Sequence, residues 1–446
     1  MTSARPDTAA PVPTAQDEVV GICQDLLRLD TSNYGDGSGP GERAAAEYVM
    51  GLLHDVGLDP EIFESEPGRA SVVVRLEGRD RTRPALVLHG HLDVVPAQAA
   101  DWSVDPFAGE ERDGLLWGRG AVDMKDMDAM ILAVVRQLVR EGRKPARDVV
   151  VAFFADEEAG GVKGARWAVD HRPELFEGAT EAISEVGGFS VDVDGRRAYL
   201  VQTAEKGLAW LRLVADGRAG HGSQVNDDNA VTRLAEAVAR IGSHPWPYTL
   251  TPTVDKLLRG VADLTGLPFD AQDPECIDAL VAALGPASRF VGATVRHSSN
   301  PTRLDAGYKA NVIPGRAEAT VDVRLLPGHE DEGIAALHLL AGEHVRVEEI
   351  HRDTALEVPF AGDLVDVMVD SLLAEDPGAA VLPYTLSGGT DNKSLHRLGI
   401  TGYGFAPLRL PADLDFAGMF HGVDERVPVD ALRFGVRVLD RLLRAC

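Results

Sequence analysis

The sequence predicts an α/β protein with a mostly parallel β-sheet flanked by helices, into which a smaller α+β domain is inserted. Short apolar runs typical of buried strands, such as residues 85–89 and 149–155, alternate with amphipathic helical segments such as residues 124–141. This alternation indicates parallel strands joined by covering helices. From residue 208 the pattern changes to the apolar–polar alternation of half-exposed strands, and near residue 363 it changes back, which indicates an insertion.

The first part of the predicted catalytic domain covers residues 17–205. Residues 1–16 are rich in alanine, proline and threonine, and we expect them to form a disordered tail. The glycine-rich loop 33–41 lacks the preceding strand that a dinucleotide-binding loop requires, so we interpret it as structural. The other elements predicted in this part are helices over 17–29, 42–56 and 163–169 and strands over 71–76 and 181–184.

The predicted insertion covers residues 206–352, and the second part of the catalytic domain covers residues 353–446. Within the insertion, residues 243–291 form a proline-rich stretch that we expect to border the active site, although its selectivity cannot be deduced. The elements predicted in the insertion are strands over 208–215, 293–298, 317–324 and 345–351 and helices over 229–241 and 332–343.

Composition excludes several classes of partner. A chain of 446 residues is too long for one ordinary core, so two or more domains are expected. The formal net charge of −26 would repel phosphate backbones and anionic membrane surfaces, which argues against nucleic acid and membrane as partners. No apolar run approaches the roughly 20 residues that span a bilayer. Three scattered cysteines and an N-terminus without a secretory pattern predict a cytoplasmic protein.

Acidic and histidine side chains follow the predicted strands, at the edge where such a sheet binds ligands. Residues 86–96 alone fit either a metal ligand with its orienting carboxylate or a strand end that meets water. Clustered carboxylates repel each other unless a cation lies between them, and a pair of dications would remove that repulsion. Imidazole and carboxylate ligands suit zinc, with cobalt or manganese as alternatives. The candidates are His91, Asp93, Asp123, Glu157, Glu158, Glu185 and His421.

Seven motifs carry a family resemblance. They are HGHLDVVP, GRGAVDMK, DEEAGG, SEVGG, GRAGHGS, NVIPGRAEATVDVR and FHG. Each alone is a weak signal, but together and in this order they are specific. From about Asn33 to His421 the chain resembles the M20 family of metallopeptidases and deacylases, which includes glutamate carboxypeptidase, aminoacylase-1, succinyl-diaminopimelate desuccinylase and carnosine-type dipeptidases. The resemblance implies a zinc-peptidase-like catalytic domain whose insertion is a lid and dimerisation domain.

The resemblance also implies a ligand set for two Zn²⁺ ions, with Co²⁺ or Mn²⁺ as alternatives. Asp123 would bridge the two ions. His91 and Glu185 would complete one site, and Glu158 with His421 would complete the other. Because some members of the family have aspartate at the position of Glu185, the metal preference could vary.

Three further residues have implied catalytic roles. Glu157 would be the general base that takes a proton from the metal-bridging water, and Asp93 would orient His91. His221, in the insertion, would help to hold the tetrahedral intermediate, and in dimeric relatives this histidine reaches the partner's active site. From the residues alone, His221 could also be an exposed loop residue. Edge strands in the insertion favour a homodimer.

Four residues match substrate-binding positions of the family. Arg324 would bind a free carboxylate with its guanidinium fork. It could instead pair with an acidic residue of its own strand. Asn311 would also contact the substrate, and Gly388 and Gly389 would lie in a loop near the same end of it.

The sequence therefore favours a di-zinc hydrolase that cleaves a peptide or amide bond next to a free carboxylate, of dipeptidase or carboxypeptidase type. The alternative is an N-acyl-amino-acid deacylase with the same mechanism, because both activities share all the residues named. A non-catalytic binding protein on this scaffold is a remote alternative, since no ligand or base is lost. A nucleotide-dependent oxidoreductase is disfavoured because the glycine fingerprint is missing.

Overall fold

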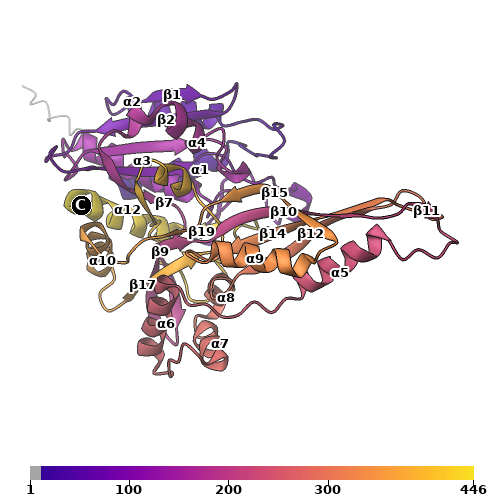
Figure 1. Cartoon of the computed structure of the whole chain (residues 1–446). Helices are drawn as coiled ribbons and strands as arrows, with labels where there is room; N and C mark the ends of the chain where they lie inside the picture. The colour runs from indigo at the N-terminus through magenta and orange to yellow at the C-terminus, as the bar shows by residue number, and fades with distance from the viewer. Residues whose placement is uncertain (1–11) are drawn as a thin grey trace, which may run out of the picture.

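The computed structural model, which describes residues 12–446, contains a large mixed sheet with helices on both faces and a smaller antiparallel sheet that extends away from it (Figure 1). This architecture confirms the predicted α/β fold with a largely parallel central sheet. In spatial order the large sheet consists of β1 (Glu61–Glu64), β2 (Ala70–Leu76), β6 (Val149–Phe154), β3 (Ala85–His91), β7 (Ala179–Ser184), β18 (Thr401–Gly404), β9 (Arg196–Glu205) and β16 (Leu356–Glu357), with β8 (Phe189–Val193) and β17 (Ala380–Leu386) also paired to β9.

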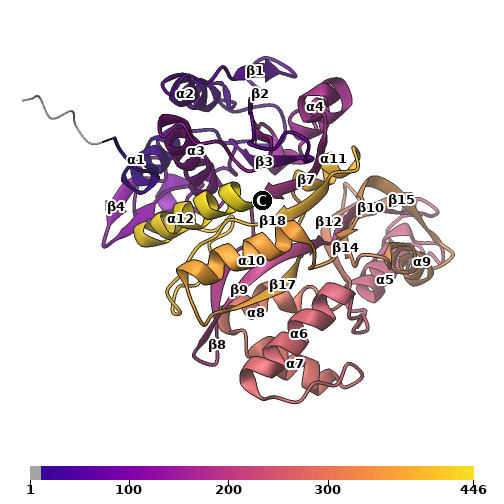
Figure 2. The same ribbon diagram turned by 90° about the vertical axis from the view of Figure 1, so that its left-hand side faces the viewer.

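Helices cover both faces of the large sheet because its strands are apolar on both sides (Figure 2). Successive side chains of β3 point to opposite faces, so Leu86 and Leu88 join one core and Val87 joins the other. The helices on the first face are α1 (Ala15–Leu27), α2 (Arg43–His54), α3 (Lys125–Arg140), α10 (Asp363–Glu375) and α12 (Val429–Ala445), and those on the second are α4 (Ala165–His171) and α11 (Asn392–His396).

The smaller sheet has its own apolar core, in which α5 (Ala230–Gly242) and α9 (Glu330–Ala341) cover one face. A two-stranded ribbon of β11 (Gly220–His221) and β13 (Val312–Ile313) lies at its far end (Figure 1). A third, short sheet joins β4 (Glu110–Arg112), β5 (Leu115–Trp117) and β19 (Arg426–Pro428). The order of the smaller sheet is β12 (Ser298–Ala306), β14 (Arg316–Leu325), β10 (Gly207–Asp216) and β15 (Val345–Asp353).

The proline-rich stretch 243–291 is largely helical, which the sequence reading did not predict. It forms α6 (Pro252–Thr265), α7 (Pro274–Ala282) and α8 (Ser288–Gly292). The prolines argued against helices in the sequence. In the structure, however, Pro252 and Pro274 occupy first turns, where a missing N–H costs no hydrogen bond. Although these helices fall inside the predicted insertion 206–352, their apolar side chains join the core of the large sheet.

Two predicted boundaries are wrong. Residues 293–297 of the predicted strand 293–298 do not form a strand; pairing starts at Ser298 and continues to Ala306. The real strand is polar and contains Pro301 at a register shift, features that obscure a strand in sequence. The predicted tail 1–16 lies mostly outside the described residues, but Ala15 and Gln16 already belong to α1, since the Asp17 carboxylate accepts the Thr14 N–H at 2.8 Å and caps the helix. No helix within residues 12–446 is long and apolar enough to cross a membrane.

Candidate metal centre

The predicted ligands meet at the carboxyl ends of the parallel strands. His91 is the last residue of β3, and Glu185 directly follows β7. Glu158 lies in the turn after β6. Asp123 comes from the loop before α3, and His421 comes from the segment between β18 and β19. Five chain segments therefore bring one side chain each to the same sheet edge.

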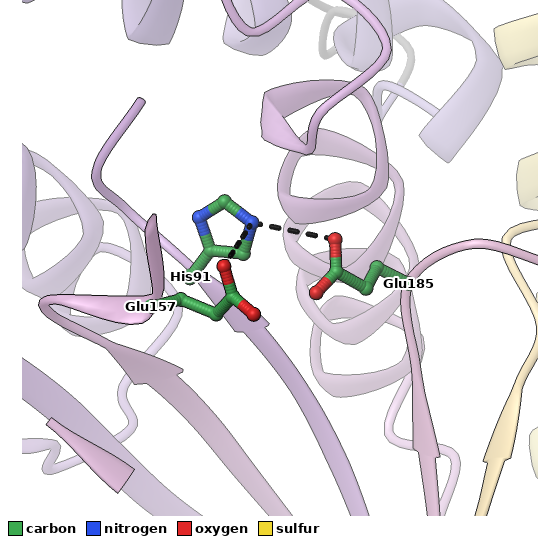
Figure 3. A group of neighbouring side chains, drawn as sticks. All are labelled: His91, Glu157 and Glu185. Atoms are coloured by element: carbon green, nitrogen blue, oxygen red, sulfur yellow. Dashed lines mark ion pairs between the residues drawn. The ribbon is translucent and has the colours of Figure 1, made fainter. Parts of the chain in front are cut away.

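The side chains form two groups that share Asp123. His91 Nε2 lies 3.2 Å from Asp123 Oδ1 and 3.3 Å from Glu185 Oε2. His421 Nε2 lies 3.3 Å from Asp123 Oδ2 and 3.0 Å from Glu158 Oε2. One oxygen of Asp123 thus faces each histidine. Glu157 Oε2 lies 4.0 Å from His91 Nε2, on the same side as Glu185 (Figure 3).

The cluster is acidic, its His91 and Glu185 are buried while His421 is exposed, and its charges are incompletely balanced by the protein. Burial raises the pKa of Glu185 to about 8. Burial and then the charge of Glu185 raise the pKa of Glu157 well above its ordinary value. Burial would also raise the pKa of Asp123, but hydrogen bonds from His421 and His91 outweigh it and lower that pKa.

The donor set fits bound dications. Glu158 Oε1 is buried and has no hydrogen-bond partner, although a buried carboxylate oxygen left alone is costly. His91, Asp123 and Glu158 each place a ligand atom within 4.8 Å of the others, and so do His91, Glu157 and Glu185. Positive charge between these oxygens would relieve both the repulsion and the missing contact.

Asp93 contacts both His91 and the turn that carries the two glutamates. His91 Nδ1 lies 2.9 Å from the main-chain carbonyl oxygen of Asp93 and 3.5 Å from its carboxylate. The Asp93 carboxylate instead accepts the main-chain N–H groups of Glu157 at 3.0 Å and Glu158 at 3.1 Å. Asp93 therefore holds His91 through its carbonyl and holds the turn that carries the two glutamates through its side chain.

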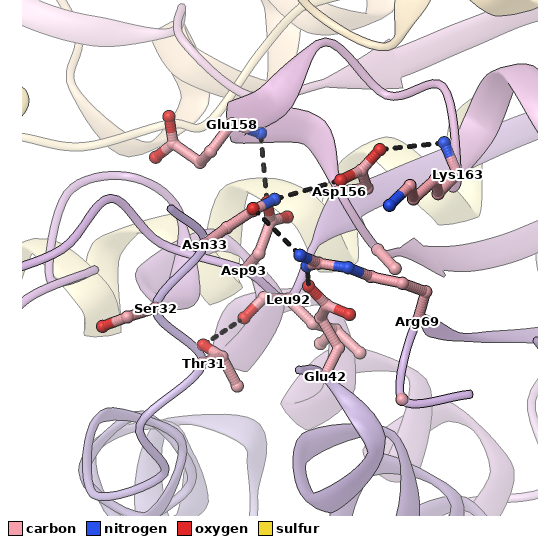
Figure 4. Close-up of polar contacts among 12 residues, drawn as sticks. Thr31, Ser32, Asn33, Glu42, Arg69, Leu92, Asp93, Asp156, Glu158 and Lys163 are labelled. Carbon is pink, nitrogen blue, oxygen red and sulfur yellow. Dashed lines mark hydrogen bonds and ion pairs between the residues drawn. The ribbon is translucent and has the colours of Figure 1, made fainter. Parts of the chain in front are cut away.

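Asn33 links this turn to the rest of the domain (Figure 4). Its Nδ2 donates to Asp93 at 2.9 Å and to Asp156 at 3.1 Å, and its Oδ1 accepts from Arg69 at 3.0 Å. Arg69 in turn pairs with the buried carboxylate of Glu42. Sequence reasoning interpreted Asn33 only as the start of a glycine-rich loop, because its partners lie 36 to 123 residues away.

The backbone of the centre adopts unusual conformations. Asp156, Val186 and His421 have positive φ angles of 67°, 51° and 57°. Such angles are rare outside glycine, and for a β-branched residue such as Val186 they are strained. His421 is a predicted ligand, Val186 adjoins the predicted ligand Glu185, and Asp156 adjoins the predicted base Glu157, so the fold accepts local strain where the side chains must converge.

A cavity of about 700 Å³ opens beside the cluster, between the large and small sheets. Asp123, Glu157, Glu158, Glu185 and His421 all line it. On the opposite side the lining includes Trp210, Arg324 and His351 of the small sheet and Gly388 and Gly389 of the loop after β17. The structure thus places Arg324, Gly388 and Gly389 in one cavity with the predicted metal ligands.

Two of the cations that line this cavity, Arg324 and Lys393, differ in their partners. The Arg324 guanidinium is held by Asp322 on its own strand, with Nε–Oδ1 at 2.7 Å and Nη2–Oδ2 at 3.0 Å. Lys393 Nζ donates to the main-chain oxygen of Lys206 at 2.9 Å and has no carboxylate partner within residues 12–446. Burial lowers the pKa of Lys393. Sequence reasoning missed Lys393, since a single lysine two residues after Asp391 carries no distinctive pattern.

His221 and Asn311 are neighbours of each other but lie away from this cavity. The N–H of Gly222, the residue after His221, donates to the Asn311 carbonyl at 2.9 Å, at the far end of the small sheet (Figure 1). Neither His221 nor Asn311 is among the described residues that line the cavity. His221 is exposed, with Nδ1 2.8 Å from Ser223 Oγ.

Glu425 is a second residue that the sequence did not reveal. It is fully buried, and its carboxylate accepts the main-chain N–H groups of Gly120, Val122 and Asp123 at 3.1, 2.7 and 3.1 Å. The same carboxylate pairs with Arg119 at 2.6 Å. Glu425 therefore fixes the loop that presents Asp123, across 302 residues of sequence.

Comparison with known proteins agrees with the motifs and with the fold. The chain is 28% identical over 419 residues to the N-fatty-acyl-amino acid synthase/hydrolase of Xenopus tropicalis, covering 90% of this chain and 80% of that protein. It is 27% identical over 416 residues to human aminoacylase-1, covering 91% of this chain and 90% of that protein. An M20 family metallo-carboxypeptidase from Sulfolobus solfataricus shares the fold, with a TM-score of 0.71 at 18% identity, over 96% of this chain and 99% of that one. The family model for peptidase family M20/M25/M40 matches residues 87–445, and the chain therefore belongs to that family of hydrolases.

Proposed function

We propose that this protein is a binuclear metal-dependent hydrolase that cleaves the amide bond of N-acyl amino acids. The observation that carries the proposal is the arrangement around Asp123, whose two carboxylate oxygens each face a different histidine and glutamate pair. His91, Asp123 and Glu185 would hold one Zn²⁺ ion, and Asp123, Glu158 and His421 would hold the other. Co²⁺ and Mn²⁺ suit the same ligands.

Glu157 is the proposed general base. When bound, dications in this position polarise a substrate carbonyl and acidify a water molecule. Glu157 lines the cavity beside the ligands, and its main-chain N–H is fixed by Asp93. From there its carboxylate takes the proton of the attacking water and returns it to the leaving nitrogen, as a positioned acid–base group does.

Lys393 and Arg324 would bind the free carboxylate of the amino-acid part. Both line the cavity, and in a chain of net charge −26 they bring positive charge to the side opposite the metal ligands. Because Arg324 is already paired with Asp322, Lys393 is the cation whose charge is available. Gly388 and Gly389 line the same end and let the backbone approach the substrate closely.

A homodimer would complete the site. His221 and Asn311 lie at the far end of the small sheet, away from the cavity of their own chain. If two chains pair through this sheet, His221 can reach the partner's cavity and hold the oxygen of the tetrahedral intermediate. We also infer a cytoplasmic location, because Cys23, Cys276 and Cys446 are all free and buried.

An N-acyl amino acid is preferred here over the peptide that the sequence favoured. The two curated relatives described above span nearly the whole chain, and their names specify acyl amino acids, whereas the metallo-carboxypeptidase is similar only at the level of the fold. Dipeptide or carboxypeptidase activity is the second candidate, since the same residues would serve it. A non-catalytic role has less support, because every ligand and the base are present.

The test combines metal removal with one substitution. Chelation should abolish hydrolysis of N-acetyl amino acids, and zinc or cobalt should restore it. Glu157→Gln should keep the metal content, measured by elemental analysis, and lower kcat by at least about a hundredfold, the scale of lost acid–base catalysis. Hydrolysis that survives chelation, or a Glu157→Gln enzyme with near-normal kcat, would refute the mechanism. Dipeptides assayed in parallel decide between the two substrate classes.

A further inference from the structure

One face of the small sheet forms a wall of the cavity beside the predicted metal ligands, and Trp210 is the largest side chain on it. Along β10, Ala209 and Leu211 join the apolar core under α5 and α9, so Leu208 and Trp210 point to the opposite face. Both line the cavity, yet Trp210 is 42% exposed. Apolar and aromatic side chains of this kind are what ligand pockets use to bind the apolar parts of their ligands. The residues of this wall are Leu208, Trp210, Arg324, His351 and Asp353.

The register of the small sheet places Trp210 beside the cations that we propose bind the free carboxylate. Leu208 lies opposite Arg324, and Trp210 lies opposite Asp322. Trp210 and Arg324 are therefore diagonal neighbours, which in such a sheet lie about 7–8 Å apart, within reach of aromatic and long side chains. Lys393 Nζ donates at 2.9 Å to the main-chain oxygen of the residue directly before β10. Both cations thus lie at the end of β10 that carries Leu208, and a carboxylate held there brings the substrate's own side chain within reach of Leu208 and Trp210.

The Trp210 ring is held in place by its polar edge. Its Nε1 donates to Asp322 Oδ2 at 3.0 Å, and the same carboxylate holds the Arg324 guanidinium. The ring also packs against the His351 ring, with centroids 5.4 Å apart and planes inclined at 45°. Because the indole N–H already has its partner, the surface that Trp210 offers to the cavity is apolar. A ring fixed in advance also loses little conformational entropy when a ligand packs on it.

The acidic groups beside this ring are matched by groups of the protein. Asp322 is paired with Arg324, as described above. Asp353 Oδ2 lies 2.8 Å from His351 Nε2, and its Oδ1 lies 3.6 Å from the Arg166 guanidinium. A charged substrate side chain would have to displace one of these partners or lose its water without compensation, which is costly. The wall therefore favours an uncharged side chain.

We propose that Leu208 and Trp210 form a subsite, the aromatic subsite, for the side chain of the amino-acid part of the substrate. The inference rests on the proposed function and deepens it, because it singles out the N-acyl derivatives of aromatic amino acids. The substrate ring would pack on the indole in an offset or edge-on arrangement while the carboxylate is held by Arg324 and Lys393. Trp210 is then a residue that determines specificity and takes no part in the chemical step.

Substrates that share one acyl group and differ in the side chain give the direct test. The kcat/KM values of the metal-loaded wild type would be compared for N-acetyl-phenylalanine, N-acetyl-alanine, N-acetyl-glutamate and N-acetyl-lysine. The phenylalanine derivative should exceed the alanine derivative by about tenfold or more, the effect of burying an aromatic side chain. The two charged derivatives should stay below the phenylalanine derivative.

Variants of β10 assign the preference to the ring. Trp210→Ala should lower the ratio of kcat/KM for the phenylalanine derivative to that for the alanine derivative by about fivefold or more. Trp210→Phe keeps an aromatic ring but loses the hydrogen bond to Asp322, and it should retain most of the preference. Arg212→Ala is the matched control and should keep the wild-type ratio. Arg212 is the next residue on the same face of β10, its side chain is 44% exposed, and it is not among the described residues that line the cavity.

The outcomes separate this inference from the proposed function. Hydrolysis of none of the four substrates by the metal-loaded wild type would overturn both. Hydrolysis without a preference for the phenylalanine derivative, or a preference that Trp210→Ala leaves unchanged, would overturn the aromatic subsite alone. An equal loss of preference in Trp210→Phe and Trp210→Ala would assign the effect to the hydrogen bond with Asp322 and would also overturn it. If Trp210→Ala does not fold, Leu208→Ala removes the other side chain of the subsite and should lower the same ratio, and an unchanged ratio in that variant would refute the subsite.

Discussion

Substitution of Glu425 tests how the loop that presents Asp123 is held in place. Its carboxylate accepts three main-chain N–H groups of the loop 120–123 and pairs with Arg119, which is also buried. In Glu425→Gln the side chain keeps its size and one acceptor oxygen. The new NH₂ group would face Arg119 and the Gly120 N–H, which are both donors. Two favourable contacts would therefore become repulsive ones.

The expected loss of stability follows from these contacts. Removing one partner of a buried ion pair costs about 3–5 kcal/mol, because the other charge is left without compensation. Arg119 still donates to the Gly422 carbonyl at 2.8 Å and lies over the Trp102 ring at 5.1 Å. We therefore expect a value near the lower end, about 3 kcal/mol. Burial raises the pKa of Glu425 to about 7, so the measurement belongs at pH 8, where the wild-type carboxylate is ionised.

The assay is urea unfolding of the metal-free protein, with metal affinity measured separately. Glu77→Gln is the matched control, because Glu77 also pairs with cations, Arg81 at 3.0 Å and Lys144 at 3.2 Å, but its side chain is 57% exposed. That change should cost less than about 1 kcal/mol. Metal affinity should fall only in Glu425→Gln, since Asp123 loses its anchor. Equal stability losses in the two variants would show that Glu425 does not hold the loop as described.

Three further predictions concern substrate binding, pH and assembly. Lys393→Met should raise KM about tenfold or more, the cost of a lost charged hydrogen bond, while Lys393→Arg stays near wild type; an unchanged KM in Lys393→Met would contradict carboxylate binding there. His297 Nδ1 accepts the Leu326 N–H at 3.0 Å, and burial lowers the pKa of His297 to about 4. The His297 imidazole takes up a proton near pH 6.5 in the unfolded chain but only near pH 4 in the folded chain, so the free energy of unfolding should fall by up to about 3 kcal/mol between pH 6.5 and 4. His297→Asn should reduce the slope of the unfolding free energy against pH. An identical slope in this variant would be evidence against the titration of His297. Mixing inactive His221→Ala with inactive Glu157→Gln should restore activity through heterodimers that contain one intact site, whereas no recovery after subunit exchange would argue against a shared site.

The central sheet was predictable because its signals are local. The apolar runs at 85–89 and 149–155 lie within β3 and largely within β6, and the predicted helix 124–141 exceeds α3 by one residue at each end. Strands buried on both faces and helices with an apolar stripe are encoded in neighbouring residues. The strand Ser298–Ala306 was not predicted, because its exposed, polar sequence with Pro301 has no such local signal.

The residues of the site also differ in whether local sequence is enough to predict them. Residues such as His91 and Glu185 could be proposed from short motifs that end strands. Glu425, Asn33 and Lys393 could not, because what identifies each is a partner far away in the chain. Glu425 meets Asp123 across 302 residues, and Lys393 meets Lys206 across 187. A side chain whose importance lies in tertiary hydrogen bonds leaves no periodicity to detect.

The packing of α6–α8 on the large sheet changes how the small sheet is tethered to the rest of the chain. Because these helices interrupt the insertion, the chain crosses between the two sheets four times rather than twice: after β9, after α5, after α8 and after β15. A domain that is connected through only two adjacent strands can rotate in several directions about that connection. Four separate crossings restrict such motion more than two adjacent ones would, so the cavity between the two sheets should keep a more nearly fixed width.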